Sequence, residues 1–170
     1  MGEQDQAPTR PAPAPTVQLP DHPDVIALPP VIYGAALGLG LVIDFVLPIQ
    51  FLPERPAVWL GILLIVTSIP IVVSALWALA RARTSFDARK PTTAIVTNGA
   101  FRFSRNPMYL AATLLYLGIA LVMNSVWVLV LVVPLMVVMQ RGVVEREERY
   151  LERKFGEEYR RYKTQVRRWM

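Results

Sequence analysis

The sequence lacks cysteine and has a single histidine, His22. The absence of cysteine excludes disulfide bonds, thiolate metal sites and a cysteine nucleophile. His22 lies in a proline-rich stretch, where we expect it to be solvated. Neither a histidine-based catalytic triad nor a metal site built from several histidines is therefore predicted. The sequence also lacks a glycine-rich dinucleotide loop.

Apolar residues dominate instead. Of the 170 residues, 54% are hydrophobic, and the mean hydropathy is +0.37. A water-soluble domain of this length rarely reaches such values. A membrane protein does, because lipid takes the place of a buried core around its apolar side chains. The length suffices for one domain.

Four long apolar segments follow the proline-rich start, at residues 31–52, 57–80, 107–123 and 125–144. Each is close to the length of about 20 residues that a helix needs to cross the hydrocarbon layer. Only Asn124 and Ser125 separate the last two segments, which predicts a tight antiparallel hairpin. We therefore expect an all-α, polytopic membrane protein with about four transmembrane helices.

Basic residues cluster beside the apolar segments. Ten of the eighteen Lys and Arg lie between Arg141 and Arg168, and six more lie between Arg81 and Arg105. Because both clusters border apolar segments, an anionic membrane surface is favoured over nucleic acid as their partner. The positive-inside rule places residues 81–106 and both termini in the cytoplasm. We expect a multi-pass protein of the plasma (inner) membrane.

The two ends of the chain differ in character. Residues 1–30 hold eight prolines and little apolar periodicity, which predicts a disordered tail ahead of a membrane domain at 31–170. Residues 145–170 have apolar side chains at spacings of three or four, which predicts an amphipathic helix. Gly156 predicts a break in that helix. We expect this segment to lie along the cytoplasmic membrane surface or to fold over the bundle.

Several residues inside the apolar segments are unusual there. Pro70 and Pro134 predict helix kinks. Gly34 and Gly38 form a pair that is typical of close helix packing. Asp44 is an acidic residue in an apolar run, and the alternatives for it are a functional role and a place at the membrane interface.

A first group of polar residues precedes the third apolar segment. Asn98-Gly99 predicts a turn. Asn106-Pro107 combines an N-cap residue with a proline at the first helical position. A helix N-terminus offers free N–H groups, and Arg105 lies beside it, so the group could seat an anionic part of a ligand. The alternative is that these residues only start a helix.

A second group follows the fourth apolar segment. Glu145, Glu148 and Glu152 share one helical face by their spacing. The alternatives are a solvated, salt-bridged helix and a carboxylate surface that attracts a cation or accepts hydrogen bonds from ribose hydroxyls. The hairpin brings the second group close to the first. A zwitterionic ligand with separate positive and negative groups would fit between them.

Four short motifs occur in order over about residues 91–168, namely Thr97-Asn98-Gly99-Ala100-Phe101-Arg102, Arg105-Asn106-Pro107-Met108-Tyr109-Leu110-Ala111, Glu147-Glu148-Arg149-Tyr150-Leu151 and Phe155-Gly156-Glu157-Glu158-Tyr159-Arg160-Arg161-Tyr162. Each is weak alone, but their order and separations are specific. With them the chain resembles the isoprenylcysteine carboxyl methyltransferase and phospholipid methyltransferase superfamily of membrane enzymes. The first two apolar segments carry no signature of their own.

The resemblance implies transfer of a methyl group from S-adenosylmethionine to a lipid-like or small apolar acceptor, which would enter from the bilayer between helices. It implies Glu148 as the catalytic residue. The cofactor-binding residues that it implies are Gly99, Arg105, Asn106, Pro107, Tyr109, Glu147 and Glu148. The carboxylate and the sulfonium of S-adenosylmethionine suit these two groups of residues.

The chain departs from the family pattern at three places. Asn106 replaces a histidine and cannot act as a general base near neutral pH. A carboxylate acceptor needs no base, whereas an amine must first lose a proton, with help from a glutamate. This favours an isoprenylcysteine-like carboxylate, with a phospholipid amine as the alternative. Ala111 replaces a glycine, and Gln165-Val166-Arg167 replaces Arg-Val-Pro, so an arginine that contacts substrate there would be displaced or lost.

Two other function classes compete with this interpretation. A non-catalytic membrane protein could keep the hairpin for assembly or ligand sensing, and it would bind S-adenosylmethionine without turnover. A lipid-facing reductase of the sterol type would need a nicotinamide site.

Overall fold

The computed structural model describes residues 22–85 and 90–169. Its helical elements, in chain order, are α1 (Pro29–Val46), α2 (Glu54–Arg81), the 3₁₀ helix η1 (Gly99–Arg102), α3 (Pro107–Val122), α4 (Val126–Val130), α5 (Val132–Met139), the π-helix η2 (Gln140–Val144), α6 (Glu145–Phe155) and α7 (Glu157–Gln165). Neither of the two described ranges contains a strand, so the predicted all-α fold is confirmed.

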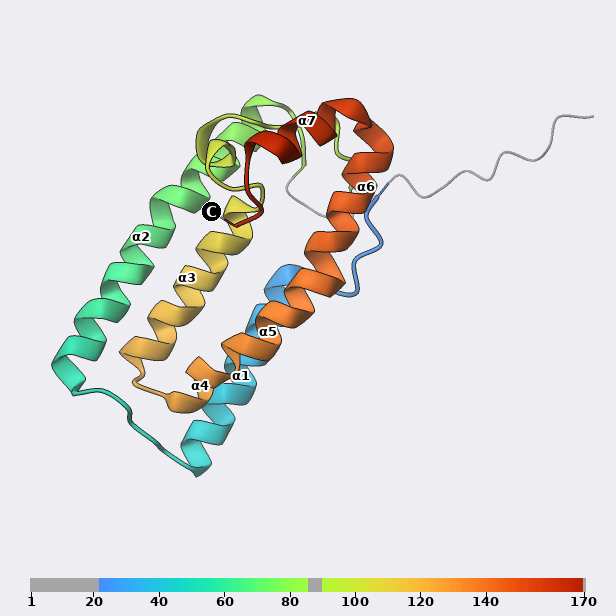
Figure 1. Ribbon diagram of the computed structural model, residues 1–170. Helices are drawn as coiled ribbons and strands as arrows, with labels where there is room; N and C mark the ends of the chain where they lie inside the picture. The colour runs from blue at the N-terminus through green and yellow to red at the C-terminus, as the bar shows by residue number, and fades with distance from the viewer. Residues whose placement is uncertain (1–21, 86–89, 170) are drawn as a thin grey trace, which may run out of the picture.

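The long helices lie side by side (Figure 1). α2 packs along α3, and α1 packs against α4 and α5. The connection from α2 to α3 gathers with α7 at one end, while the α1–α2 loop and the α3–α4 turn lie at the other. We call the first end, made of residues 82–85, 90–106 and 145–169, the polar cap. Both clusters of basic residues therefore reach the same end of the molecule.

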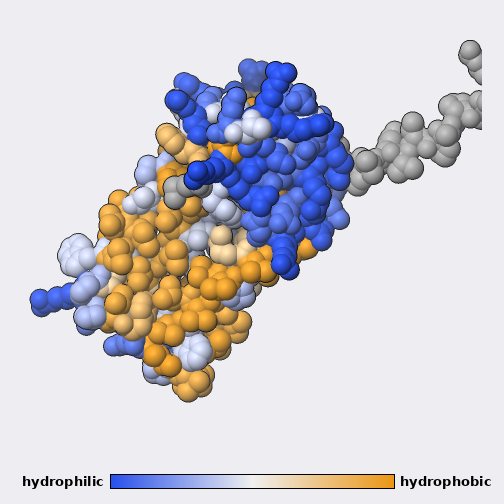
Figure 2. All heavy atoms as spheres, in the orientation of Figure 1, coloured by the Kyte–Doolittle hydropathy of each residue, from blue (hydrophilic) through white to orange (hydrophobic). Residues whose placement is uncertain are grey.

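Three helical stretches are long and apolar enough to cross a membrane, namely α1, α2 and the run Val126–Phe155 that comprises α4 to α6. The predicted count of about four includes α3, which is apolar but has only 16 residues. On the face shown in Figure 2, apolar residues cover much of the bundle below the polar cap, and hydrophilic residues gather over the polar cap. Eight of the eleven residues of α6 are charged, so the apolar part of its run ends at Val144, and we expect α6 to lie outside the hydrocarbon layer.

The first predicted span, 31–52, is wrong at its C-terminal end, because α1 stops at Val46. Pro48 disfavours helical backbone at the residue before it, which explains the stop. The following loop is tied to the hairpin turn by Asn124. Its Oδ1 accepts from the N–H groups of Phe51 (3.4 Å) and Leu52 (3.3 Å), and its Nδ2 donates to the Leu52 carbonyl (2.8 Å).

The predicted tight hairpin is confirmed, and it gives Asp44 a partner. Ser125 caps α4, because its Oγ accepts from the N–H of Val128. The same hydroxyl donates to the Asp44 carboxylate at 2.7 Å. Asp44 therefore joins α1 to the turn at the end of the bundle opposite the polar cap, which is a structural role.

The prolines and glycines have unequal effects on the helices. The fourth helical run is interrupted at Leu131, because Pro134 cannot donate a hydrogen bond to the preceding turn. α2 continues through Pro70. The prediction that Gly34 and Gly38 allow close packing is wrong within this chain, since a Cβ added to either would have no described atom within 4 Å.

The close helix contact lies elsewhere, between α2 and α3. A Cβ added to Gly61 would lie 2.7 Å from the Gly118 carbonyl oxygen, and one added to Gly118 would lie 2.6 Å from Ile65 Cγ1. Both glycines therefore let the two backbones approach each other.

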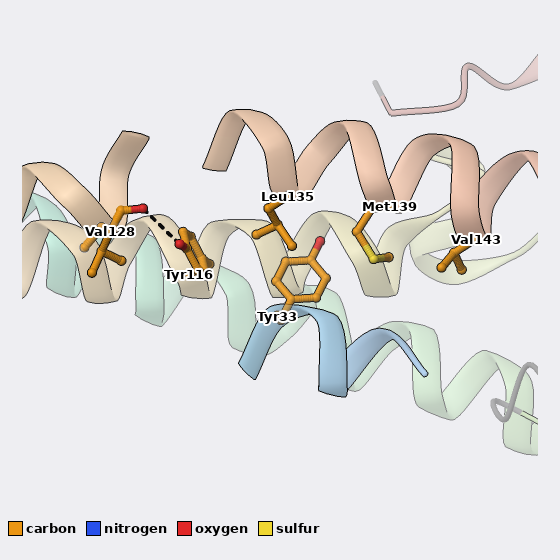
Figure 3. Close-up of a cluster of buried hydrophobic side chains, with 7 residues drawn as sticks. Tyr33, Tyr116, Val128, Leu135, Met139 and Val143 are labelled. Atoms are coloured by element: carbon orange, nitrogen blue, oxygen red, sulfur yellow. Dashed lines mark hydrogen bonds between the residues drawn. The ribbon is translucent and has the colours of Figure 1, made fainter. Parts of the chain in front are cut away.

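The core lies between α1, α3 and α5, with Tyr33, Tyr116, Leu135 and Met139 in contact (Figure 3). Polar atoms inside it are paired. The Tyr116 hydroxyl donates to the Val128 carbonyl at 2.9 Å. This core fixes α3 and the fourth helical run relative to each other, which in turn positions the first turn of α3 beside α6.

The first and last described segments of the chain pack against the fold. Residues 1–21 of the predicted tail lie outside the described part, while residues 22–30 of that tail pack against the fold. Ile26 donates its N–H to the Gly142 carbonyl (3.2 Å), and Asp24 forms an ion pair with Arg146 (3.5 Å). At the other end, the predicted break at Gly156 is confirmed, and α7 folds over the bundle.

Candidate functional site

A cavity of about 140 Å³ lies in the polar cap, where α6 passes the start of α3. We call it the polar cavity. Six of the seven residues predicted to bind the cofactor line its wall, namely Arg105, Asn106, Pro107, Tyr109, Glu147 and Glu148. The seventh, Gly99, has a φ of +58° and faces α2, where an added Cβ would lie 3.0 Å from Ser74 Oγ. Gly99 therefore turns the chain onto α2 outside the cavity wall.

Arg105 presents buried donors to the polar cavity. Its side chain is 10% exposed, and its Nη1 lies 3.3 Å from Glu148 Oε1, an ion-pair distance. Its Nε and Nη1 are buried and have no hydrogen-bond partner among the described residues. Buried guanidinium N–H groups without acceptors are costly. An anionic group of a ligand would satisfy them.

The N-terminus of α3 adds backbone donors next to Arg105. Pro107 occupies the first helical position, as predicted, but no side chain caps the helix. The Asn106 side chain donates instead to the Arg168 carbonyl (3.2 Å), and the Asn106 N–H donates to Ser104 Oγ (3.1 Å). Asn106 occupies the predicted N-cap position, but its side chain makes no capping hydrogen bond to α3. The N–H groups of the first turn remain uncapped, which suits an anion.

Glu148 is buried in an ion-pair cluster. Arg168 donates to both of its oxygens, from Nε at 3.0 Å and from Nη2 at 2.7 Å. These hydrogen bonds raise the pKa of the Arg168 guanidinium. Together with Arg105, they surround the Glu148 carboxylate with positive charge. Glu148 thus holds the C-terminal residues against α6.

Glu147, the adjacent residue, has a different environment. Its Oε1 accepts a hydrogen bond of 2.6 Å from the Tyr109 hydroxyl. Burial raises the pKa of the Glu147 carboxyl to about 7, the Tyr109 hydrogen bond opposes this shift, and the charge of Glu148 adds to it. Glu147 therefore changes its protonation state near neutral pH.

A second cavity, of about 540 Å³, lies between α1, α2 and α3. We call it the apolar cavity. Its wall includes Leu37, Val72 and Leu115 from the three helices. Leu115 is also 42% exposed on the apolar outer surface, so the cavity lies next to the lipid-facing side. Met108 and Tyr109 line both cavities, and they form the partition between them.

The polar cavity also contains residues that the sequence interpretation did not assign to it. Tyr159 and Tyr162 of α7 line it, and burial raises the pKa of Tyr162 to about 12. Their spacing of three in the quoted motif was the signal that could have found them. Pro23 lines it from the N-terminal side, which no sequence pattern indicated.

Comparisons with known proteins agree with these features. The sequence pattern of the family described as phospholipid methyltransferase matches residues 56–158, more than half of the chain. An uncharacterized protein of Haemophilus influenzae is 43% identical over 63 residues, which are 37% of this chain and 100% of that protein. No solved structure matches the chain.

The apolar helices and the two cavities define a polytopic helical membrane protein with room for a ligand in its polar cap. Within that class, the chain belongs to the phospholipid methyltransferase family, whose members are membrane methyltransferases. The resemblance drawn from the four motifs is confirmed. The family match begins in α2, well before the first of those motifs.

Proposed function

We propose that the protein transfers a methyl group from S-adenosylmethionine to the head group of a lipid-like acceptor. The observation that carries this proposal is the buried Nε of Arg105, which has no hydrogen-bond partner among the described residues, while Nη1 of the same guanidinium group lies at an ion-pair distance of 3.3 Å from Glu148. Arg105 lines a cavity whose wall also includes Glu147. A zwitterionic ligand such as S-adenosylmethionine matches this pairing of donors and acceptors.

The chain's own residues would hold the cofactor by opposite charges. Arg105 and the uncapped N-terminus of α3 would bind its carboxylate. Glu147 would accept hydrogen bonds from its ribose hydroxyls. Bound there, S-adenosylmethionine supplies an activated methyl group on a sulfonium sulfur. In this proposal the ion pairs of Glu148 make it a positioning residue instead of the predicted catalytic residue.

The acceptor would occupy the apolar cavity, which borders the polar cavity at Met108 and Tyr109. Its apolar chain would reach the bilayer between helices, and its head group would lie at the partition. Two head-group classes remain candidates. Asn106 cannot act as a general base, which favours a carboxylate acceptor of the isoprenylcysteine type, since that acceptor needs no base. The carboxylate of Glu147 could take a proton from an ammonium group, which favours an amine acceptor of the phospholipid type. We place the polar cap on the cytoplasmic side of the plasma (inner) membrane.

Calorimetric titration of S-adenosylmethionine into the detergent-purified protein tests the proposal. We expect saturable binding by the wild type and a dissociation constant raised about tenfold in Arg105→Gln, because a charge-assisted hydrogen bond is lost. Arg102→Gln is the matched control, since Arg102 is an exposed arginine of the same loop. Absence of binding by folded wild-type protein would contradict the proposal. Binding without transfer to any acceptor would favour the non-catalytic alternative.

A further inference from the structure

The π-helix η2 sets the direction of the side chains on α6. Its wide turn is visible at Glu145, whose N–H donates to the carbonyl of Gln140, five residues earlier. Such a turn adds one residue to the helix, and each residue of an α-helix turns the chain by about 100°. Single π-helical turns inside α-helices are frequent at functional sites. The residues that follow η2 therefore point in other directions than they would in an uninterrupted α-helix.

The added residue decides which of two neighbouring side chains faces α3. Met139 is fully buried in the core, and Arg146 follows it by seven residues, a spacing that shares one face of an uninterrupted α-helix. In the structure, Arg146 turns instead to the N-terminal side of the fold, where its Nη1 donates to the Asp24 carbonyl at 2.7 Å. Glu147 faces α3, and its carboxylate accepts from the Tyr109 hydroxyl. Without η2, the arginine and not the carboxylate would face α3.

The N-terminal segment, which we define as residues 22–28, packs against η2. The N–H of Ile26 donates to the Gly142 carbonyl at 3.2 Å. A Cβ added to Gly142 would lie 2.7 Å from Ile26 Cγ1, so the Ile26 side chain occupies the space beside the glycine. Pro23 of the same segment lines the polar cavity. The N-terminal segment therefore touches both the π-helix and the wall of the candidate site.

The contact between Ile26 and Gly142 outweighs the neighbouring ion pair between Asp24 and Arg146. The ion pair spans 3.5 Å, and the Asp24 side chain is 92% exposed. Water screens such a pair, which then contributes little to stability. Gly142 is buried, and Ile26 contacts it through both its backbone and its side chain. The Ile26 contact is therefore the one that can hold η2.

We propose that Ile26 and Gly142 are positioning residues of the cofactor site, because their contact holds η2 and thereby directs Glu147 toward the polar cavity. This inference rests on the proposed function, in which Glu147 accepts hydrogen bonds from the ribose hydroxyls of S-adenosylmethionine. The N-terminal segment lies ahead of residues 56–158, which match the family. Ile26 is thus a part of the site that the family match does not include.

Calorimetric titration of S-adenosylmethionine into detergent-purified variants tests the inference. In Gly142→Ala the added methyl group displaces the Ile26 side chain. We expect the dissociation constant to rise about tenfold, because small displacements of binding groups are costly. Alanine favours helical backbone more than glycine does, so helix propensity alone predicts no such loss. Gly38→Ala is the matched control, since no described atom lies within 4 Å of its added Cβ. Asp24→Asn should also bind as the wild type.

A reciprocal exchange separates positioning from general damage. Ile26→Ala alone should raise the dissociation constant about threefold, because a supporting contact is lost. Ile26→Ala also removes the atoms that the methyl group of Gly142→Ala would meet. The double variant should therefore bind within about threefold of the wild type. In a Glu147→Ala background, Gly142→Ala should cause no further loss of binding, since both changes act on the same hydrogen bonds.

These measurements distinguish a failure of the inference from a failure of the proposed function. Folded wild-type protein that does not bind S-adenosylmethionine would overturn the proposed function. Wild-type binding together with an unchanged dissociation constant in Gly142→Ala and Ile26→Ala would overturn the inference alone. Weakened binding that the double variant does not restore, or a further loss in the Glu147→Ala background, would also overturn it. Thermal unfolding of each variant verifies that the protein titrated is folded.

Discussion

At the scale of single residues, the arrangement around Glu148 is the main finding beyond the sequence. The sequence predicted Glu147 and Glu148 as site residues, but it did not predict their division of roles. Arg168 lies twenty residues after Glu148, beyond the reversal at Gly156. Helical periodicity describes neighbours three and four positions apart, so it could not reveal this pair.

The Arg168–Glu148 pair should stabilise the polar cap. Arg168→Gln removes two hydrogen bonds from a buried carboxylate, and we expect the free energy of unfolding to fall by about 1–2 kcal/mol, because part of Arg168 is solvent-exposed and screened. Thermal unfolding of the purified protein would measure the change. Arg167→Gln is the control, since the Arg167 side chain is exposed. Equal melting temperatures for the two variants would contradict a stabilising role of the Arg168–Glu148 pair.

At the scale of elements, helix starts and turns were predictable and helix contacts were not. α2, α3 and the hairpin turn at Asn124 follow from apolar length and from short polar interruptions. The end of α1 was misplaced because apolar residues continue after Val46, although Pro48 already marks the stop. The packed segment 22–30 was missed because its contacts are with Gly142 and Arg146, far away in sequence.

The glycine contact between α2 and α3 gives a prediction at this scale. Gly61→Ala introduces a Cβ that overlaps the Gly118 carbonyl, and we expect a loss of about 1–3 kcal/mol of stability. Gly38→Ala adds the same methyl group to α1, where no described atom lies within 4 Å. Thermal unfolding of both variants should show a lowered midpoint for Gly61→Ala only. An equally lowered unfolding midpoint in both variants would mean that the close contact between α2 and α3 does not cause the loss of stability in Gly61→Ala.

At the scale of the whole molecule, the absence of cysteine makes the orientation directly testable. Arg153→Cys places one thiol in the polar cap, and Gln50→Cys places one at the opposite end, both at exposed positions. With a membrane-impermeant maleimide on intact bacterial cells, we expect only Gln50→Cys to be labelled. Arg153→Cys should react after the membrane is permeabilised. The reverse pattern would invert the orientation expected from the basic residues.

The partition formed by Met108 and Tyr109 has a consequence for the order of events in a catalytic cycle. Each reactant of the proposed reaction would have a cavity of its own, one in the polar cap and one between the apolar helices. Neither needs to leave before the other can arrive or depart. We therefore expect a random-order sequential mechanism, in which a competitor of one reactant leaves the affinity for the other nearly unchanged.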